Sequence, residues 1–329
     1  MFTHFLRNRN SSKWFRSRVT GILILSLIAT YSQESNKGAF KYEIELGTDN
    51  DFLVVNTSTD KYYTYGINAS FRWRLDKPNF ISKLFSNRTG YFESLGFNME
   101  GYTPDYQSSK NETERPYAGW SYFEFQSTYG FKKSFLRLGI DVGILGPDSQ
   151  VGAVQNWFHG HVTGDRVLDG WKYQINNQLG VNLRVLYAVS FYQNKIFDFY
   201  GATDISLGNI FTYINPGINF RIGKFNSLSN SAAYQNAILA NNSNREFFLD
   251  GGIAVKMSAF NATIQGNKID EFNFIDSEII NNVYFNGQIG MYYGSNRWTL
   301  GAKYFFSSGE LNDNDSQRYA MLTFSYKFD

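Results

Sequence analysis

Two side chains in the middle of the chain, Gln155 and His159, have the types and the spacing of a small catalytic pair. Residues four apart project from one face of a helix, so a short helix over 152–159 would present the amide and the imidazole to the same substrate. Imidazole is the commonest general base in enzymes. Only His159 and His161 follow residue 32, so an imidazole base would be one of these two, although a structural loop histidine is the alternative. Asp165 lies six residues after His159 and is a candidate to orient the imidazole ring of His159 or to bind a metal. A solvated loop carboxylate without either role is the alternative.

A second polar group, Asn50 and Asp51, follows the first predicted strand. Carboxylate and carbonyl oxygens are the ligands that a hard cation such as Ca²⁺ prefers. Asn and Asp are also ordinary turn formers, so a turn without a ligand remains the alternative. The next strand is predicted to begin at residue 63, and antiparallel pairing would return Thr64 beside Asn50 and Asp51.

The elements that would position these side chains are predicted to be strands. The chain of 329 residues is 18% aromatic, and period-two alternation recurs after residue 38. Leu138, Ile140 and Val142, for example, alternate with Gly139 and Asp141, so that one face suits hydrocarbon and the other suits water. The predicted strands are 39–47, 63–75, 91–102, 118–130, 134–145, 179–193, 197–208, 211–222, 246–259, 279–293, 297–307 and 318–328.

The number and length of these strands favour a membrane over a soluble β-sandwich. Their number is even, and nearly all exceed the roughly 5–6 residues of globular strands, as a tilted bilayer crossing requires. The last strand gathers apolar residues on one face, which is typical of barrels in the outer membrane: Ala320, Leu322, Phe324, Tyr326 and Phe328. The sequence therefore predicts an all-β fold, a transmembrane antiparallel β-barrel of 12 strands.

Connection lengths predict how the barrel is oriented, because short turns face the periplasm and long loops face outward. A short helix is also expected within 78–88. The short connections are 131–133, 194–196, 209–210 and 294–296, and the longer ones are 48–62, 103–117, 146–178, 223–245, 260–278 and 308–317.

The N-terminal segment predicts export. Residues 1–32 carry five basic side chains before a short apolar run, a pattern typical of a signal peptide, and residues 33–329 form the predicted barrel domain. This segment holds five of the 31 basic side chains and none of the 29 acidic ones, so the remainder has a net charge of −3. Nucleic acid is therefore not an expected partner. The absence of cysteine excludes thiol chemistry and disulfides.

Several short motifs occur in one order and together resemble the outer-membrane lipid A 3′-O-deacylase family. The similarity covers roughly residues 40–180, and the C-terminal half matches only as barrel strands. The motifs are Asn50-Asp51-Phe52, the segment 59–66, Thr103-Pro104, Glu114-Arg115-Pro116-Tyr117-Ala118-Gly119-Trp120, Gly146-Pro147, Gln155 with His159, and Gly170-Trp171 with Gln174.

The resemblance implies a calcium-dependent hydrolase that removes an ester-linked acyl chain from lipid A. It implies a monomer in the outer membrane of a Gram-negative bacterium, with lipopolysaccharide and outer-membrane lipids as partners. The implied catalytic residues are His159, Asn50, Gln155 and Thr64, with Asp51 and Asp165 at the metal and Lys110 at the substrate. Asp165 stands where the family pattern has Glu, which shortens the side chain.

Two alternatives to this activity are a serine-dependent phospholipase and a passive barrel. A serine-dependent outer-membrane phospholipase would need Ser and Asn arranged around its histidine, and the chain has no His-x-Ser-Asn-Gly arrangement. A porin or structural barrel would need a wide lumen, which large inward side chains such as Arg72, Arg74, Arg137 and Arg184 would narrow.

Overall fold

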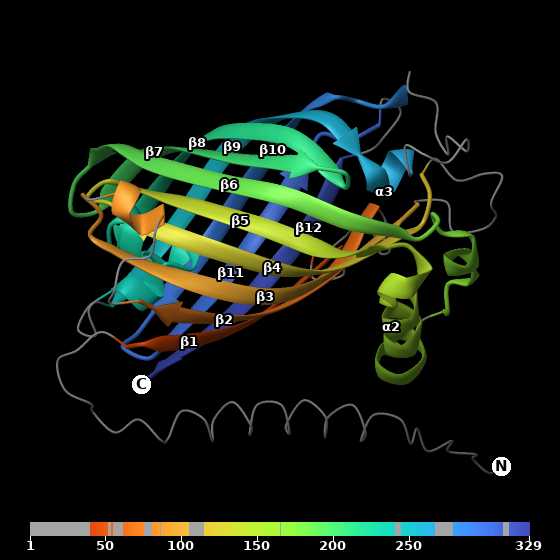
Figure 1. Ribbon diagram of the computed structural model, residues 1–329, viewed down its shortest axis with the longest axis horizontal. Coiled ribbons are helices and arrows are strands. Elements are labelled where there is room, and N and C mark those ends of the chain that lie inside the picture. Colours follow the sequence, from red (N-terminus) through yellow and green to blue (C-terminus); the bar gives the residue numbers. More distant parts are fainter. Residues whose placement is uncertain are drawn as a thin grey trace, which may run out of the picture. The chain divides into compact units, whose positions relative to one another are not determined.

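The computed structural model describes residues 40–51, 54, 62–75, 81–85, 87–104, 115–164, 166–240, 245–266, 279–311 and 316–329. Within these ranges, twelve antiparallel strands form one closed barrel, in which β12 pairs back to β1 (Figure 1). This confirms the predicted fold, whereas the predicted leader lies outside the described residues. The strands are β1 (Tyr42–Asn50), β2 (Tyr62–Arg74), β3 (Gly90–Thr103), β4 (Ala118–Gly130), β5 (Ser134–Leu145), β6 (Gln178–Gln193), β7 (Phe197–Gly208), β8 (Phe211–Lys224), β9 (Glu246–Asn261), β10 (Val283–Gly294), β11 (Trp298–Ser307) and β12 (Gln317–Phe328).

The two faces of each strand have the predicted character. In β5, Val142 and Ile144 are exposed on the outside, while Arg137 and Asp141 are buried toward the lumen. The largest differences from the predicted bounds lie in β1 and at the start of β10. β1 runs three residues later than predicted because its pairing with β12 continues to Asn50, and β10 begins only at Val283.

Helical segments are short and lie outside the strands. The helix predicted within 78–88 is a single 3₁₀ turn, η2 (Ile81–Leu84). The helix predicted at 152–159 is α2 (Val151–Phe158), which continues into the π-turn η4 (His159–Thr163). A second short helix, α3 (Ala262–Gln265), follows β9. No helix in the described ranges is long and apolar enough to cross a membrane.

Strict alternation of the antiparallel strands assigns each connection to one end of the barrel. The short turns 131–133, 194–196 and 295–297 lie at the end where β1 starts and β12 finishes, which is the periplasmic end by the turn-length rule. The predicted sides of 209–210 and 223–245 were therefore wrong. The short turn lies at the outer end, and the long connection between β8 and β9 lies at the periplasmic end.

Residues 225–240 of this long connection form a folded unit inside the periplasmic end of the barrel, here called the plug (Figure 1). It consists of three 3₁₀ turns, η6 (Leu228–Asn230), η7 (Ala232–Tyr234) and η8 (Ala237–Leu239). Ile238 and Leu239 pack against Phe92 of β3.

Side chains of the barrel wall also bind the plug. Arg137 of β5 donates to the carbonyl of Tyr234 at 2.6 Å, and Gln235 donates to Glu45 of β1 at 2.6 Å. Lys327 of β12 donates to the carbonyl of Ala237 at 3.4 Å. The plug thus lies in the periplasmic end of the lumen and is bonded there to β1, β5 and β12.

Candidate functional site on the outer wall

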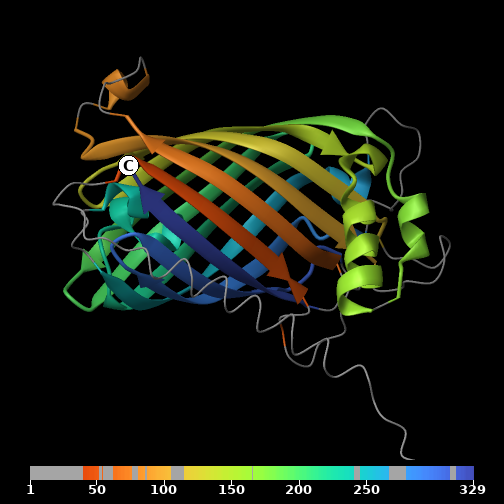
Figure 2. The same ribbon diagram turned by 90° about the horizontal axis from the view of Figure 1, so that it is seen from below.

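Helix α2 lies against the outside of the barrel at its extracellular end (Figure 2). It packs on the continuation of the outward face of β3, which carries Leu95 and Phe97 farther along the strand. Two glycines allow the close approach, because a Cβ on Gly119 would lie 2.7 Å from Cβ of Val151, and one on Gly101 would lie 3.3 Å from Cγ1 of Val151.

Tyr65 of β2 fixes the start of this helix. Its hydroxyl donates to the carbonyl of Val151 at 2.6 Å, and its ring belongs to a buried apolar cluster. The cluster joins wall, helix and loop, and it comprises Tyr65, Tyr117, Val151, Leu168 and Trp171. The helix is therefore anchored by one hydrogen bond and by packing.

Gln155 and His159 lie together on the buried side of α2, with 4% and 6% of their surfaces exposed. The indole nitrogen of Trp171 donates to Oε1 of Gln155 at 2.9 Å. Nδ1 of His159 lies 2.9 Å from the carbonyl oxygen of Arg166. The amide and the imidazole are thus both buried, one helical turn apart, as the spacing predicted.

His161 has a different environment. It is exposed, its ring stacks on Trp157 with 5.6 Å between centroids, and its Nδ1 lies 2.9 Å from the carbonyl oxygen of Trp157. Only His159 of the two is buried between the helix and the rest of the protein.

Asn50 and Thr64 lie on neighbouring strands of the same region. Asn50 is the last residue of β1 and pairs with Tyr65 of β2. It shares its face of the strand with Ile44 and Leu46, which are 45% and 61% exposed, so it points to the outside of the barrel. Asp51 follows immediately and is buried.

The pairing of β1 with β2 brings residue 64 next to the end of β1, as predicted, and a β-bulge lies at this point. The pairing of β2 with β3 shifts register between Tyr63 and Tyr65. As a result Tyr63 turns into the lumen, where its hydroxyl donates to Asp49 at 2.7 Å, while Tyr65 turns outward under α2. The Thr64 hydroxyl lies 2.6 Å from that of Thr103. Bulges next to functional sites often redirect side chains in this way.

Tyr65 connects the two halves of the candidate site, because it is the pairing partner of Asn50 and also the anchor of α2. Lys110 and Asp165 lie outside the described residues. Within the described ranges, no three His, Asp or Glu side chains cluster as metal ligands would.

The motif 114–120 has a role that the sequence did not predict. Arg115 is buried at the extracellular end, where it donates to Thr263 at 3.1 Å, pairs with Glu310 at 3.4 Å and lies over the ring of Tyr102 at 5.1 Å. Tyr117 packs edge-on against Trp171 at 5.2 Å. The motif therefore ties loops together beside the site.

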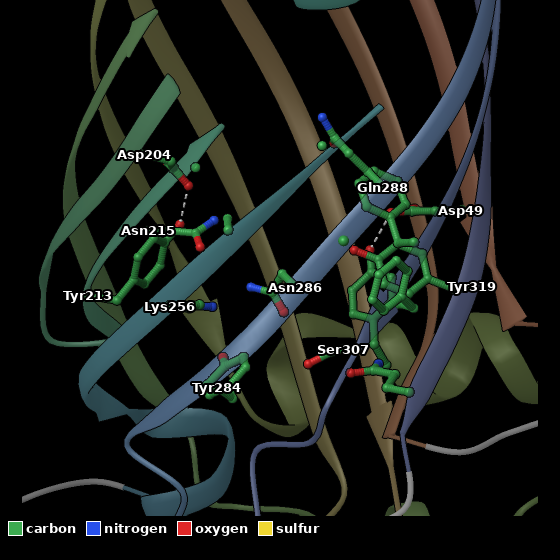
Figure 3. A pocket seen from close by; sticks show the side chains of 18 of the residues that line it. Asp49, Asp204, Tyr213, Asn215, Lys256, Tyr284, Asn286, Gln288, Ser307 and Tyr319 are labelled. Carbon is green, nitrogen blue, oxygen red and sulfur yellow. Dashed lines mark hydrogen bonds between the residues drawn. The ribbon is translucent and has the colours of Figure 1, made fainter. Parts of the chain in front are cut away.

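The lumen holds a cavity of about 510 Å³ that is separate from this site (Figure 3). Its wall carries tyrosines bonded to carboxylates, such as Tyr213 to Asp204 at 2.7 Å, with Lys256 over the Tyr213 ring at 4.2 Å. Neither Gln155 nor His159 lines it. Asn50, Gln155 and His159 thus lie on the outer side of the barrel and not in its interior.

Comparisons with known proteins agree with this architecture. The family model described as outer membrane protein LpxR matches residues 19–328. LpxR from Salmonella typhimurium has a similar fold, with a TM-score of 0.68 and 18% identity over 87% of this chain and 100% of that chain. The β-domain of the Bordetella autotransporter BrkA has a TM-score of 0.44 and 7% identity, covering 88% and 100%. The KdgM porin has a TM-score of 0.39 and 6% identity, covering 87% and 99%.

A comparison with curated protein sequences finds no match. The family model nevertheless spans nearly the whole chain, and the barrel matches a solved structure of that family over its full length. The chain therefore belongs to the LpxR family of outer membrane proteins and is located in the outer membrane of a Gram-negative bacterium.

Proposed function

We propose that this protein hydrolyses an ester that links an acyl chain to lipid A, the activity implied by its resemblance to the lipid A 3′-O-deacylases. The proposal rests on the location of the candidate site on the outer side of the barrel wall. Asn50 shares its outward face with exposed Ile44 and Leu46, and α2 packs on the outward face of β3. A site on the outside of a membrane barrel faces lipid, so an amphiphile in the outer leaflet is the fitting substrate.

His159 is the proposed general base. A carbonyl oxygen only accepts hydrogen bonds, so Nδ1 of His159 donates to Arg166 and the neutral ring carries its lone pair on Nε2. Nε2 takes a proton from water as the water oxygen bonds to the ester carbonyl carbon. When the ester C–O bond breaks, His159 returns that proton to the departing alkoxide, which yields a free fatty acid and a lipid alcohol.

Amide and hydroxyl groups would bind the ester around this base. With Oε1 of Gln155 accepting from Trp171, the NH₂ group of the amide is the donor for the ester carbonyl oxygen. Asn50 supplies a second amide from β1, and Thr64 supplies a hydroxyl from the bulge beside it. Lys110 is proposed to bind an anionic group of the substrate.

The donor atoms at Asn50 and Asp51 fit a hard cation, because an amide oxygen and a buried carboxylate are oxygen ligands of the kind that Ca²⁺ takes. We propose Asp51 and Asp165 as metal ligands. A bound Ca²⁺ would supply positive charge close to the reacting carbonyl. The protein would hold the Asp51 carboxylate at the end of β1, next to β2, whose Tyr65 anchors α2.

The plug argues against the alternative of a passive porin. It occupies the periplasmic end of the lumen and is bonded to the wall at Glu45, Arg137 and Lys327. A diffusion pore needs a continuous aqueous path, which packed protein at one end opposes.

The proposed function is tested with purified protein folded in detergent and purified lipid A, analysed by mass spectrometry with Ca²⁺ and with a chelator. We expect the loss of the mass of one acyl chain in the presence of Ca²⁺ only. Unchanged lipid A after prolonged exposure to the Ca²⁺-supplied protein would contradict the proposal.

A further inference from the structure

The chain that follows α2 turns back and runs along the helix. Gly164 adopts a left-handed conformation with φ of 77°, and its amide donates to the carbonyl of His159 at 2.8 Å. Residues 166–171, here called the return segment, then pass beside the helix face that carries Gln155 and His159. The positions of both proposed catalytic side chains therefore depend on this segment.

The side chain of Asn156 in α2 binds both backbone polar groups of one residue in the return segment, Leu168. The amide oxygen of Asn156 accepts from the backbone N–H of Leu168 at 2.8 Å, and its NH₂ group donates to the backbone carbonyl of Leu168 at 3.2 Å. The Leu168 side chain is buried in the cluster with Tyr65 and Trp171. Leu168 is thus fixed in place, and Arg166 lies two residues before it.

The carbonyl of Arg166 holds the His159 ring at Nδ1. If it moves, the hydrogen bond at Nδ1 is lost, and with it the preference for a proton on Nδ1. Partners that hold the second nitrogen of a functional histidine set both its tautomer and its orientation.

We propose that Asn156 is a positioning residue, which acts through Leu168 and the Arg166 carbonyl to hold His159 with its proton on Nδ1. The inference rests on the proposed role of His159 as the base. Asn is suited to the task because one planar amide donates and accepts at once, whereas a carboxylate only accepts.

The chain contains a matched control for this device. Asn209, in the turn between β7 and β8, also donates and accepts with its side-chain amide, and its two partners are backbone groups of two residues of β6. Its oxygen accepts from the N–H of Val181 at 2.7 Å, and its NH₂ group donates to the carbonyl of Leu179 at 2.7 Å. Asn209→Ala therefore removes one accepted and one donated side-chain bond, and neither reaches the return segment in the part of the chain that the structure describes.

The experiment compares the wild-type protein with Asn156→Ala, Asn156→Asp and Asn209→Ala, each labelled with ¹⁵N-histidine and folded in detergent micelles. The ¹⁵N chemical shifts of the ring nitrogens distinguish a proton on Nδ1 from one on Nε2, and His159→Gln assigns the His159 signals. The same samples are assayed for kcat and KM on lipid A.

We expect Asn156→Ala to move the His159 proton away from Nδ1 and to lower kcat about 10–100-fold with little change in KM, as losses of such supporting contacts typically do. Asn156→Asp, which keeps only the bond from the Leu168 N–H, should be intermediate, and Asn209→Ala should match the wild type in both measurements.

A wild-type tautomer in Asn156→Ala and Asn156→Asp would overturn the inference, whatever the activity. If Asn156→Ala does not fold, the Asn156→Asp spectrum decides. A shifted tautomer in a protein that never cleaves lipid A would leave the positioning of His159 standing and refute the proposed function instead.

Discussion

Replacing His159 by alanine should separate its proposed chemical role from its structural one. Loss of a general base lowers rates by about 10²–10⁴-fold, which corresponds to roughly 3–5 kcal/mol of activation free energy. The hydrogen bond from the ring to the Arg166 carbonyl is worth less, because a net contribution of about 0.5–1.5 kcal/mol corresponds to about 13-fold at most.

His161→Ala is the appropriate control, because it removes a bond of the same kind and the same 2.9 Å length from an exposed ring. Both variants are assayed by single-turnover cleavage of lipid A, and their folding is checked by heat-dependent mobility on gels. We expect near wild-type turnover for His161→Ala. A loss of less than about 100-fold in folded His159→Ala, or an inactive His161→Ala, would refute His159 as the base.

Three further outcomes are expected. Chelation should abolish deacylation and Ca²⁺ should restore it, whereas full activity of Asp51→Ala in chelator would rule out the proposed metal site. Gly119→Val should push α2 from the wall at a cost of about 1–3 kcal/mol and lower activity, while Gly160→Ala, whose Cβ would meet nothing within 4 Å, should behave as wild type. In planar bilayers the wild type should show no stable channels, and replacing the plug, residues 225–240, by a short flexible linker should produce them. Conducting wild-type protein would contradict a closed plug.

Much of the fold was predictable because a barrel strand leaves a strong local pattern. Residues such as Val142 and Asp141 alternate between lipid and lumen, and this fixes both the existence and the facing of β5. Loop length is a weaker guide, because alternation of strand direction decides the side. That is why the connection after β8 was placed at the wrong end.

The site was predictable where it depends on neighbours in sequence or in a hairpin. The four-residue spacing paired Gln155 with His159, and strand pairing returned Thr64 to Asn50. The bonds that Asn156 and Arg115 make were not predictable, because they join segments whose proximity only the folded barrel creates. The periodic pattern carries no information about such contacts.

The plug also bears on the order in which this barrel can assemble. Its bonds reach Glu45 in the first strand and Lys327 in the last, residues that are 190 and 90 positions away from their partners. Contacts between such distant segments form late, since the loop-closure entropy must be overcome first. β1 and β12 meet along a seam of nine residue pairs, and the plug bridges that seam from within. Closure of the barrel and docking of the plug therefore stabilise each other, so the seam is held by side chains as well as by its backbone ladder.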